Sequence, residues 1–335
     1  MIPGVPVEAR WVRLEPRRTL PPGYLERIVG TAFPSRVVVD VQRLSDGLRN
    51  ANFRLQIESI SGSPSELVVL RIYEQDASLC RKEVDLLRLI GHSVPVSEVI
   101  HAEPEGLNDI PPFVLFRFVQ GISFQELKRS GDAASICEAA FAVGQTLALI
   151  GRTIFPQSGW IGPGPHVSSG LMQGPRFVDL CLASSNLQGR MEADLRDRTQ
   201  ALVWSCAQDM ASLDDERCLV HGDFGKRNLM LQRVAGKWTV ASILDWEFAI
   251  SGTPLIDIGH FLRYERAARP VAEPHFSEGF MSAGGKLPPG WCRLARAIDL
   301  IALCESLTHD ELPDAVVAEL IELIRATVED RDPQQ

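Results

Sequence analysis

The apolar positions in the N-terminal part of the chain fall into short runs separated by turn residues. The runs are rich in β-branched and aromatic side chains, which is typical of antiparallel strands. They are Val37–Gln42, Asn52–Ile57, Leu67–Tyr73, a run near Ser97–His101, and Phe113–Val119. After the third run, Leu79–Ile90 has mostly helical spacing and ends at Gly91. The pattern predicts a five-stranded antiparallel sheet with one helix across it.

Beyond Gly121 the apolar pattern changes to long stretches with helical spacing, divided by loops rich in Gly and Pro. These stretches are Ala133–Thr153, Arg190–Ser212, Trp291–Leu307 and Asp314–Thr327, with short apolar strands expected at Cys218–Val220 and Ala241–Leu244. We therefore predict an α+β protein with an N-terminal lobe at residues 37–120 and a mainly helical C-terminal lobe at residues 121–335. Residues 1–36 would form an N-terminal extension that wraps the surface, with one short helix near Tyr24–Val29.

The net charge of the chain limits the kinds of molecule that we expect it to bind. The chain has 34 Lys and Arg against 43 Asp and Glu, a formal net charge of -9. A nucleic-acid partner would need a clustered basic surface, so we expect none. The negative charge leaves room for a cationic small-molecule substrate, although an acidic surface that keeps the protein dissolved is the simpler explanation. The sequence does not indicate the oligomeric state.

The cysteines and the first residues of the chain indicate the cellular compartment of the protein. The 7 cysteines are scattered without a C-x-x-C pair, so we expect neither a zinc site nor a disulfide framework. The first residues lack the basic and apolar regions of a signal peptide. No run approaches the roughly 18 uninterrupted apolar residues of a membrane span. These features predict a cytoplasmic protein without a membrane partner.

The most informative stretch is Leu219–Met230, in which an apolar strand leads through a tight turn to Asp223 and, five residues later, to Asn228. A second apolar strand then leads into Asp245. Phosphoryl transfer needs one carboxylate that orients the attacking hydroxyl and accepts its proton, and oxygen ligands that hold Mg²⁺. The order of these residues therefore predicts a site for phosphoryl transfer.

The stretch His221-Gly-Asp followed by Asn228, with the later Ile243-Leu-Asp-Trp-Glu247, resembles the motifs of aminoglycoside phosphotransferases, choline kinases and related protein-kinase-like enzymes. This resemblance implies a bilobal protein-kinase-like fold and an Mg²⁺-dependent reaction with ATP, with GTP as an alternative donor. It assigns the catalytic role to Asp223 and the metal to Asn228 and Asp245. It also implies that Asp257, in Gly252–Gly259, hydrogen-bonds the catalytic loop as structural support.

The resemblance extends to the nucleotide. The loop that contains Gly47 and Asn50 resembles the family's nucleotide-covering loop, although it has a single Gly. Arg71 occupies the position of the family's phosphate-binding Lys, and a guanidinium can clamp phosphate with two hydrogen bonds. Glu83 matches the acid that pairs with this cation, against the alternative of an exposed helix glutamate. The segment with Phe116, Phe118 and Val119 resembles the hinge whose backbone meets adenine.

Several polar residues have more than one interpretation. His221 could act as a base, but we expect its imidazole to bond the backbone of the catalytic loop. Glu247 could contact Mg²⁺ through water, meet a cationic substrate, or form a salt bridge with a neighbouring Arg. Four acids could line a pocket for amines, although at helical spacing they are more typical of a solvated face. These acids are Asp299, Glu305, Asp310 and Glu311.

The sequence thus predicts an ATP-dependent O-phosphotransferase that acts on a small molecule with a hydroxyl group. An aminoglycoside-like antibiotic, another amino alcohol and a sugar all fit. The alternative is a non-catalytic nucleotide-binding protein with a kinase-like fold. A protein kinase is disfavoured, because the chain lacks His-Arg-Asp and Ala-Pro-Glu segments.

Overall fold

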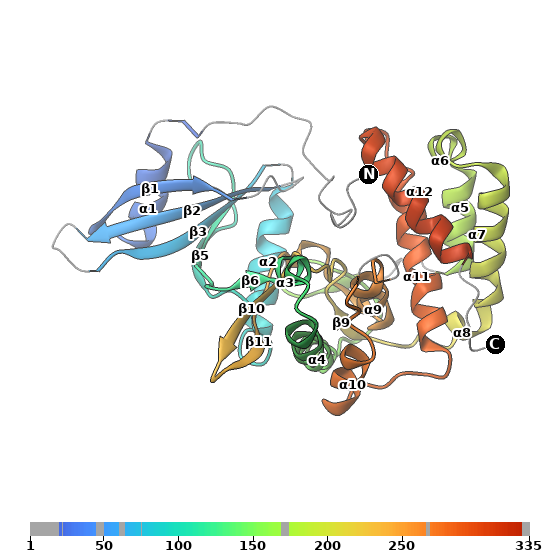
Figure 1. Ribbon diagram of the computed structural model, residues 1–335. Helices are drawn as coiled ribbons and strands as arrows, with labels where there is room; N and C mark the ends of the chain where they lie inside the picture. The colour runs from blue at the N-terminus through green and yellow to red at the C-terminus, as the bar shows by residue number, and fades with distance from the viewer. Residues whose placement is uncertain are drawn as a thin grey trace.

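The chain folds into two lobes. The structure, a computed structural model, describes residues 20–21, 23–44, 50–59, 64–74, 76–168, 174–265 and 269–329. Figure 1 shows a sheet at one end of the molecule and a larger, mainly helical part at the other. The predicted α+β architecture is confirmed, whereas the domain boundaries at residues 36 and 120 stay predictions.

The N-terminal lobe is built on a five-stranded antiparallel sheet in the order β1-β2-β3-β5-β4. Its strands are β1 (Arg36–Arg43), β2 (Asn50–Ser59), β3 (Glu66–Tyr73), β4 (Val99–Glu103) and β5 (Phe113–Arg117). The register places Arg71 of β3 opposite Asn52 of β2 and Val114 of β5. Arg71 therefore projects from the central strand of the sheet.

Two helices cover this sheet, one on each face. Helix α2 (Ala77–Ile90) begins after Asp76, whose side chain accepts a hydrogen bond from the amide of Ser78. On the other face, α1 (Tyr24–Ala32) buries Ile28 and Val29 against the strands. Only one helix was predicted across the sheet, and residues before 36 were expected to wrap the surface. Instead, the α1 helix contributes to the core of the lobe because its apolar side chains fill the second face.

The C-terminal lobe is mainly helical. Its helices are α3 (Phe124–Ser130), α4 (Ala133–Ile150), α5 (Pro175–Ala183), α6 (Ser185–Arg190), α7 (Ala193–Ser205), α8 (Ala207–Ala211), α9 (Leu255–Leu262), α10 (His275–Ser282), α11 (Trp291–Ser306) and α12 (Asp314–Glu329). The single helix expected over Arg190–Ser212 is wrong in detail, because the backbone leaves the helical conformation at Cys206. Helix α4 follows the prediction closely and is capped by Asp132.

Two small sheets within this lobe position the motif residues. Their orders are β11-β10-β6 and β8-β7-β12-β9. The strands are β6 (Ile122–Ser123), β7 (Gly159–Ile161), β8 (Val167–Ser168), β9 (Cys218–Val220), β10 (Leu229–Val234), β11 (Lys237–Ile243) and β12 (Ile250–Gly252). Strand β9 leads into the loop of Asp223, and β11 leads toward Asp245 and a 3-10 turn, η2 (Trp246–Phe248). The strand expected at Ala241–Leu244 is the end of the longer β11.

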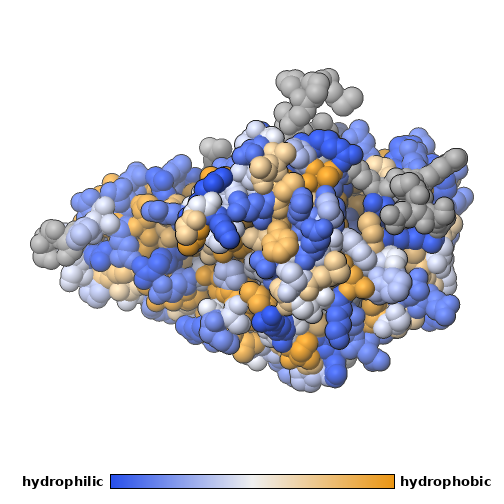
Figure 2. Space-filling view, turned by 60° about the horizontal axis from the view of Figure 1, so that its bottom comes forward, coloured by the Kyte–Doolittle hydropathy of each residue, from blue (hydrophilic) through white to orange (hydrophobic). Residues whose placement is uncertain are grey.

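Among the described residues, α4 alone has the length and apolar composition of a membrane-spanning helix. Its apolar window is 56% buried inside the protein, as in the core helix of a globular domain. Figure 2 shows mostly hydrophilic side chains over the face in view, with apolar residues in smaller groups between them. All 7 cysteines are free, and Cys80, Cys181, Cys206 and Cys304 are buried.

Candidate active site

Asp257 on α9 bonds the backbone of the loop that carries Asp223. The Asp257 carboxylate accepts hydrogen bonds from the amides of His221 (2.7 Å) and Gly222 (2.9 Å). Burial raises the pKa of Asp257 to about 7, and these two bonds oppose the rise. Gly222 has a φ of 81°, and a Cβ there would lie 2.3 Å from the carbonyl oxygen of Phe248. The turn therefore requires glycine at this position.

The imidazole of His221 connects the catalytic loop to the end of β11. Its Nδ1 accepts a hydrogen bond from the amide of Asp223 at 3.1 Å, and its Nε2 lies 2.8 Å from the carbonyl oxygen of Leu244. Burial lowers the pKa of His221 to about 4. A neutral imidazole with its proton on Nε2 satisfies both contacts. The ring thus bonds backbone on both sides.

Asn228 joins Asp223 to the strand that leads into Asp245. Its Nδ2 donates to the carbonyl oxygen of Asp223 at 2.9 Å and to Oδ2 of the Asp223 side chain at 3.0 Å. The carbonyl oxygen of Asn228 accepts from the amide of Leu244 at 2.8 Å. One hydrogen-bond network therefore brings together the catalytic loop and the residue that precedes Asp245.

Asp245 occupies the left-handed backbone region, with φ 69° and ψ 64°. Aspartate tolerates this region better than most residues because its short polar side chain can bond locally. The side chain is about one-third exposed and forms an ion pair with the Nη2 of Arg71. This pair joins the N-terminal sheet to the C-terminal lobe beside the catalytic loop.

The guanidinium of Arg71 is nearly saturated by protein acceptors. Its Nε donates to Asn52 at 3.0 Å, and its Nη1 donates to both carboxylate oxygens of Glu83 at 2.9 Å. With the Asp245 contact, all three nitrogens of the guanidinium bond protein acceptors. Burial opposes the charge of Arg71, but Asp245 and Glu83 raise its pKa well above the ordinary value. To bind a phosphate with two hydrogen bonds, Arg71 would therefore have to release some of these protein acceptors.

Glu83 is a buried helix residue rather than an exposed one, with 2% of its side chain accessible. Besides Arg71, it accepts hydrogen bonds from the hydroxyl of Tyr73 and from the amide of Trp246 at 3.2 Å. Trp246 directly follows Asp245 in the chain. Glu83 thus fixes the position of α2 relative to the turn that carries Asp245.

Glu247 bonds an amide rather than an arginine. The Nδ2 of Asn50 donates to its Oε2 at 2.8 Å, and both side chains are buried. Burial, followed by repulsion from Asp245, raises the pKa of Glu247. Lys82 of α2 donates to the backbone carbonyl of Glu247 at 2.6 Å. Gly47, the other residue expected in the nucleotide-covering loop, lies outside the described residues.

The expected hinge connects the two lobes at the end of β5. Phe116 is buried and pairs with Val69 of β3, and the amide of Phe118 donates to the carbonyl of Leu67 at 3.4 Å. Val119 follows the strand and makes no backbone hydrogen bond with another described residue. Its amide and carbonyl are therefore available to a ligand that bonds backbone.

The structure adds a residue that the sequence did not point to. His260 of α9 places its Nε2 3.3 Å from Oδ1 of Asp223. The only signal was its position three residues after Asp257, one helical turn along the same face.

The solvated face predicted for the C-terminal acids is wrong for Asp299, which is buried and pairs with Arg263 at 2.7 Å. Arg263 is the residue at the C-terminal end of α9, and the spacing of residues along α11 does not reveal this contact.

The donor set suits magnesium. Among the described residues no group of three or more His, Cys, Asp and Glu side chains is arranged to hold a metal ion. Mg²⁺ is bound in nucleotide-dependent enzymes by one or two carboxylates together with phosphate oxygens, so it does not need such a group. Asn228 uses its amide nitrogen within the protein, and its Oδ1 is the atom that could act as a ligand together with the Asp245 carboxylate. These two oxygen donors fit the expected ion.

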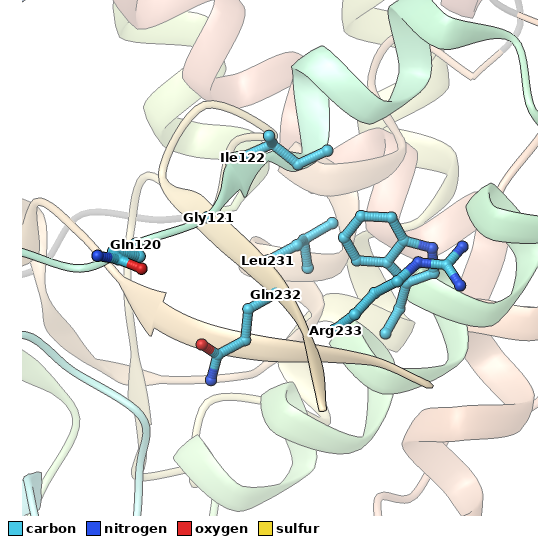
Figure 3. A pocket seen from close by; sticks show the side chains of 7 residues that line it. Gln120, Gly121, Ile122, Leu231, Gln232 and Arg233 are labelled. Carbon is cyan, nitrogen blue, oxygen red and sulfur yellow. The ribbon is translucent and has the colours of Figure 1, made fainter. Parts of the chain in front are cut away.

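A separate hollow of about 370 Å³ lies beyond the hinge, on the side of β10 and β11. Figure 3 shows the side chains that line it. They are Gln120, Gly121, Ile122, Leu231, Gln232, Arg233 and Trp238. The guanidinium of Arg233 stacks over the indole of Trp238 at 4.7 Å. None of the motif residues lines this hollow, so it is distinct from the site around Asp223.

Solved structures of aminoglycoside phosphotransferases share this architecture. One is aminoglycoside phosphotransferase APH(4)-Ia in a ternary complex with AMP-PNP and hygromycin B, with 19% identity, a TM-score of 0.63, and 91% of this chain and 97% of that chain covered. Another is aminoglycoside 2'-phosphotransferase-IIIa with GDP, with 17% identity, a TM-score of 0.67, and 90% and 97% covered. The GDP and kanamycin complex of APH(2")-IIIa has 18% identity, a TM-score of 0.65, and 90% and 97% covered. The predicted bilobal, protein-kinase-like fold is confirmed.

Sequence comparisons identify the family. Among curated proteins, no sequence matches this chain. The family model described as the phosphotransferase enzyme family, APH, matches residues 40–296, which is more than half of the 335 residues. This range contains β2 to α9 and every motif residue discussed above. The chain therefore belongs to the phosphotransferase enzyme family.

Proposed function

We propose that this protein is a kinase that transfers the γ-phosphoryl group of Mg·ATP to a hydroxyl group of a small molecule. The observation that carries the proposal is the hydrogen-bond network in which Asn228 bonds Asp223 directly and reaches Leu244, the neighbour of Asp245. It brings one candidate base and two candidate metal ligands, from separate parts of the sequence, into one site.

Each residue has a defined task in this proposal. Asp223 orients the acceptor hydroxyl and takes its proton at a carboxylate oxygen, while Asn228 Oδ1 and Asp245 hold Mg²⁺. The bound ion would neutralise charge on the phosphates. Because the transition state of phosphoryl transfer is loose, positioning and charge neutralisation account for most of the rate enhancement. Arg71 and Glu83 keep the two lobes in register around the phosphates.

The hinge supports a purine nucleotide as the donor. The backbone groups of Val119, which bond no described residue, match the need of a purine base for one donor and one acceptor. Some similar structures contain AMP-PNP and others GDP. We propose ATP as the donor, with GTP as the alternative.

For the acceptor we propose an aminoglycoside-like antibiotic, another amino alcohol or a sugar. Similar structures contain hygromycin B or kanamycin. The net charge of -9 agrees with a cationic acceptor and disfavours a nucleic-acid partner. The free, mostly buried cysteines agree with a reducing cytoplasm. We propose a cytoplasmic enzyme without a membrane partner.

The first prediction concerns Asp223. Asp223→Ala should lower turnover by at least about 100-fold, because it removes the group that orients the hydroxyl and accepts its proton. Binding of Mg·AMP-PNP, measured by calorimetry, should stay within about twofold of the wild type, since the proposed metal ligands remain. Turnover is followed by coupled ADP release.

The acceptor is first found in a screen of ADP release across aminoglycosides, macrolides, choline-like amines and simple sugars. An enzyme gives acceptor-dependent ADP release with at least one class. A non-catalytic nucleotide-binding protein would instead be stabilised by Mg·ATP against thermal unfolding and release no ADP. Near-normal turnover in Asp223→Ala would remove Asp223 from the mechanism.

A further inference from the structure

His260 is the side chain of α9 that reaches the candidate catalytic carboxylate. Its Nε2 lies 3.3 Å from Oδ1 of Asp223, and the imidazole is 17% exposed. Asp257, one helical turn earlier, bonds the backbone of the same loop. Gly225 gives the ring room, since a Cβ there would lie 3.4 Å from Nε2. Helix α9 therefore supports both the backbone and the side chain of the catalytic loop.

The surroundings of His260 favour its neutral form. Burial lowers its pKa well below the ordinary value, and the nearby charges of Arg263, His221 and Lys226 lower it further. The two cations are themselves paired, Arg263 with Asp299 at 2.7 Å and Lys226 with Glu265 at 3.1 Å. In this form the imidazole carries one N–H, and Nε2 is the ring nitrogen that lies 3.3 Å from the Asp223 carboxylate.

Each oxygen of the Asp223 carboxylate therefore has beside it a neutral side chain that can donate a hydrogen bond. Asn228 Nδ2 lies 3.0 Å from Oδ2, and His260 Nε2 lies 3.3 Å from Oδ1. Two donors on opposite oxygens fix the rotation of the carboxylate plane. Because a carboxylate oxygen accepts more than one hydrogen bond, these contacts leave it able to receive an acceptor hydroxyl. His260 therefore adds a contact at Oδ1 to the Asn228 bond at Oδ2.

We propose that His260 is a positioning residue that holds the Asp223 carboxylate in the orientation needed to receive the acceptor hydroxyl. This inference rests on the proposed function and adds a residue to its machinery. A displacement of about 1 Å in a reacting group can cost about 100-fold in rate, so the loss of one of two orienting contacts should be visible in turnover.

The test compares His260→Leu with His260→Gln, with the acceptor found in the screen. Leucine fills the space without a donor, whereas the glutamine amide can place an N–H near the position of Nε2. For His260→Leu we expect kcat to fall by about 10-fold to 100-fold, with the KM for Mg·ATP within about twofold. His260→Gln should recover most of kcat. His309→Leu, at an exposed imidazole, is the matched control and should leave kcat unchanged.

Equal losses in His260→Leu and His260→Gln, or an unchanged kcat in His260→Leu, would overturn the proposal. If His260→Leu does not fold, ¹⁵N spectra of the histidine side chains in wild type and Asp223→Ala decide. The contact predicts a protonated Nε2 in His260 whose resonance moves when Asp223 is removed, and an unmoved resonance would overturn it. If the wild type releases no ADP with any acceptor while the resonance does move, the proposed function fails and the contact has no catalytic meaning.

Discussion

Arg71 lies in a charge cluster with Glu83 and Asp245 at the junction of the two lobes. Its guanidinium contacts Asn52, Glu83 and Asp245 together, which a lysine ammonium cannot match with its single nitrogen. We predict that Arg71→Lys lowers the free energy of unfolding by about 1–2 kcal/mol, through lost charge-assisted hydrogen bonds. It should raise the affinity for Mg·AMP-PNP about fivefold, because Asp245 is held less tightly and the ammonium can turn toward phosphate.

Chemical denaturation and calorimetry measure the two effects. Arg71→Met serves as the comparison, since it leaves the buried Glu83 without a cation and should cost about 3–5 kcal/mol. A lower nucleotide affinity in Arg71→Lys would contradict this, because an N–H group of the wild-type guanidinium would then already contact the phosphates.

Among individual residues, the sequence predicted those whose proposed role follows from the residues next to them in the chain. Asp223, Asn228 and Asp245 were predicted from their spacing after apolar strands, and in the structure Asn228 bonds both Asp223 and the amide of Leu244, the residue before Asp245. His260 and Asp299 could not be predicted in the same way. His260 sits within an apolar helical run, and Asp299 has the spacing of a surface acid, so only the packing of α9 against α11 shows their partners.

Helices α4 and α10 cross so closely that their glycines touch backbone. A Cβ at Gly144 would lie 2.0 Å from the carbonyl oxygen of Phe276, and one at Gly279 would lie 2.1 Å from that of Phe141. We predict that Gly144→Ala lowers the free energy of unfolding by about 2 kcal/mol or more, because neither backbone can yield without moving its helix. Thermal unfolding without ligand measures the change.

Gly189→Ala is the matched control within another helix. A Cβ at Gly189, in α6, meets no atom within 4 Å. Alanine there should raise the free energy of unfolding by about 0.4–1 kcal/mol by restricting the unfolded chain. Equal effects of the two substitutions would show that the helix crossing is not close in solution.

Element types were predictable where the apolar period was long and regular. The five strands of the N-terminal sheet and helices α4, α11 and α12 follow directly from it. The pattern did not reveal α10, a helix of 8 residues that contacts α4 closely at Gly279, and it joined α7 and α8 into one helix. Both differences arise from local backbone geometry, which hydrophobic spacing does not record.

Several contacts between the two lobes converge on the segment that contains Asp245. From the N-terminal lobe, Arg71 contacts Asp245, Glu83 bonds the amide of Trp246, and Lys82 bonds the carbonyl of Glu247. The Nδ2 of Asn50 adds a hydrogen bond to the Glu247 side chain. The placement of Asp245, the proposed metal ligand, is thus coupled to the relative position of the lobes.

The last prediction decides the role of Glu247 in this junction. Glu247→Gln retains an oxygen for the Asn50 amide and removes a buried charge, so the free energy of unfolding should change by no more than about 0.5 kcal/mol. Asn50→Ala leaves the buried carboxylate without its donor and should cost about 1–3 kcal/mol. If Glu247 serves only to join the lobes, Glu247→Gln also retains its affinity for Mg·AMP-PNP in calorimetry. A tenfold weaker affinity in a Glu247→Gln protein of wild-type stability would contradict this, because the negative charge itself would then be needed for the metal-bound nucleotide.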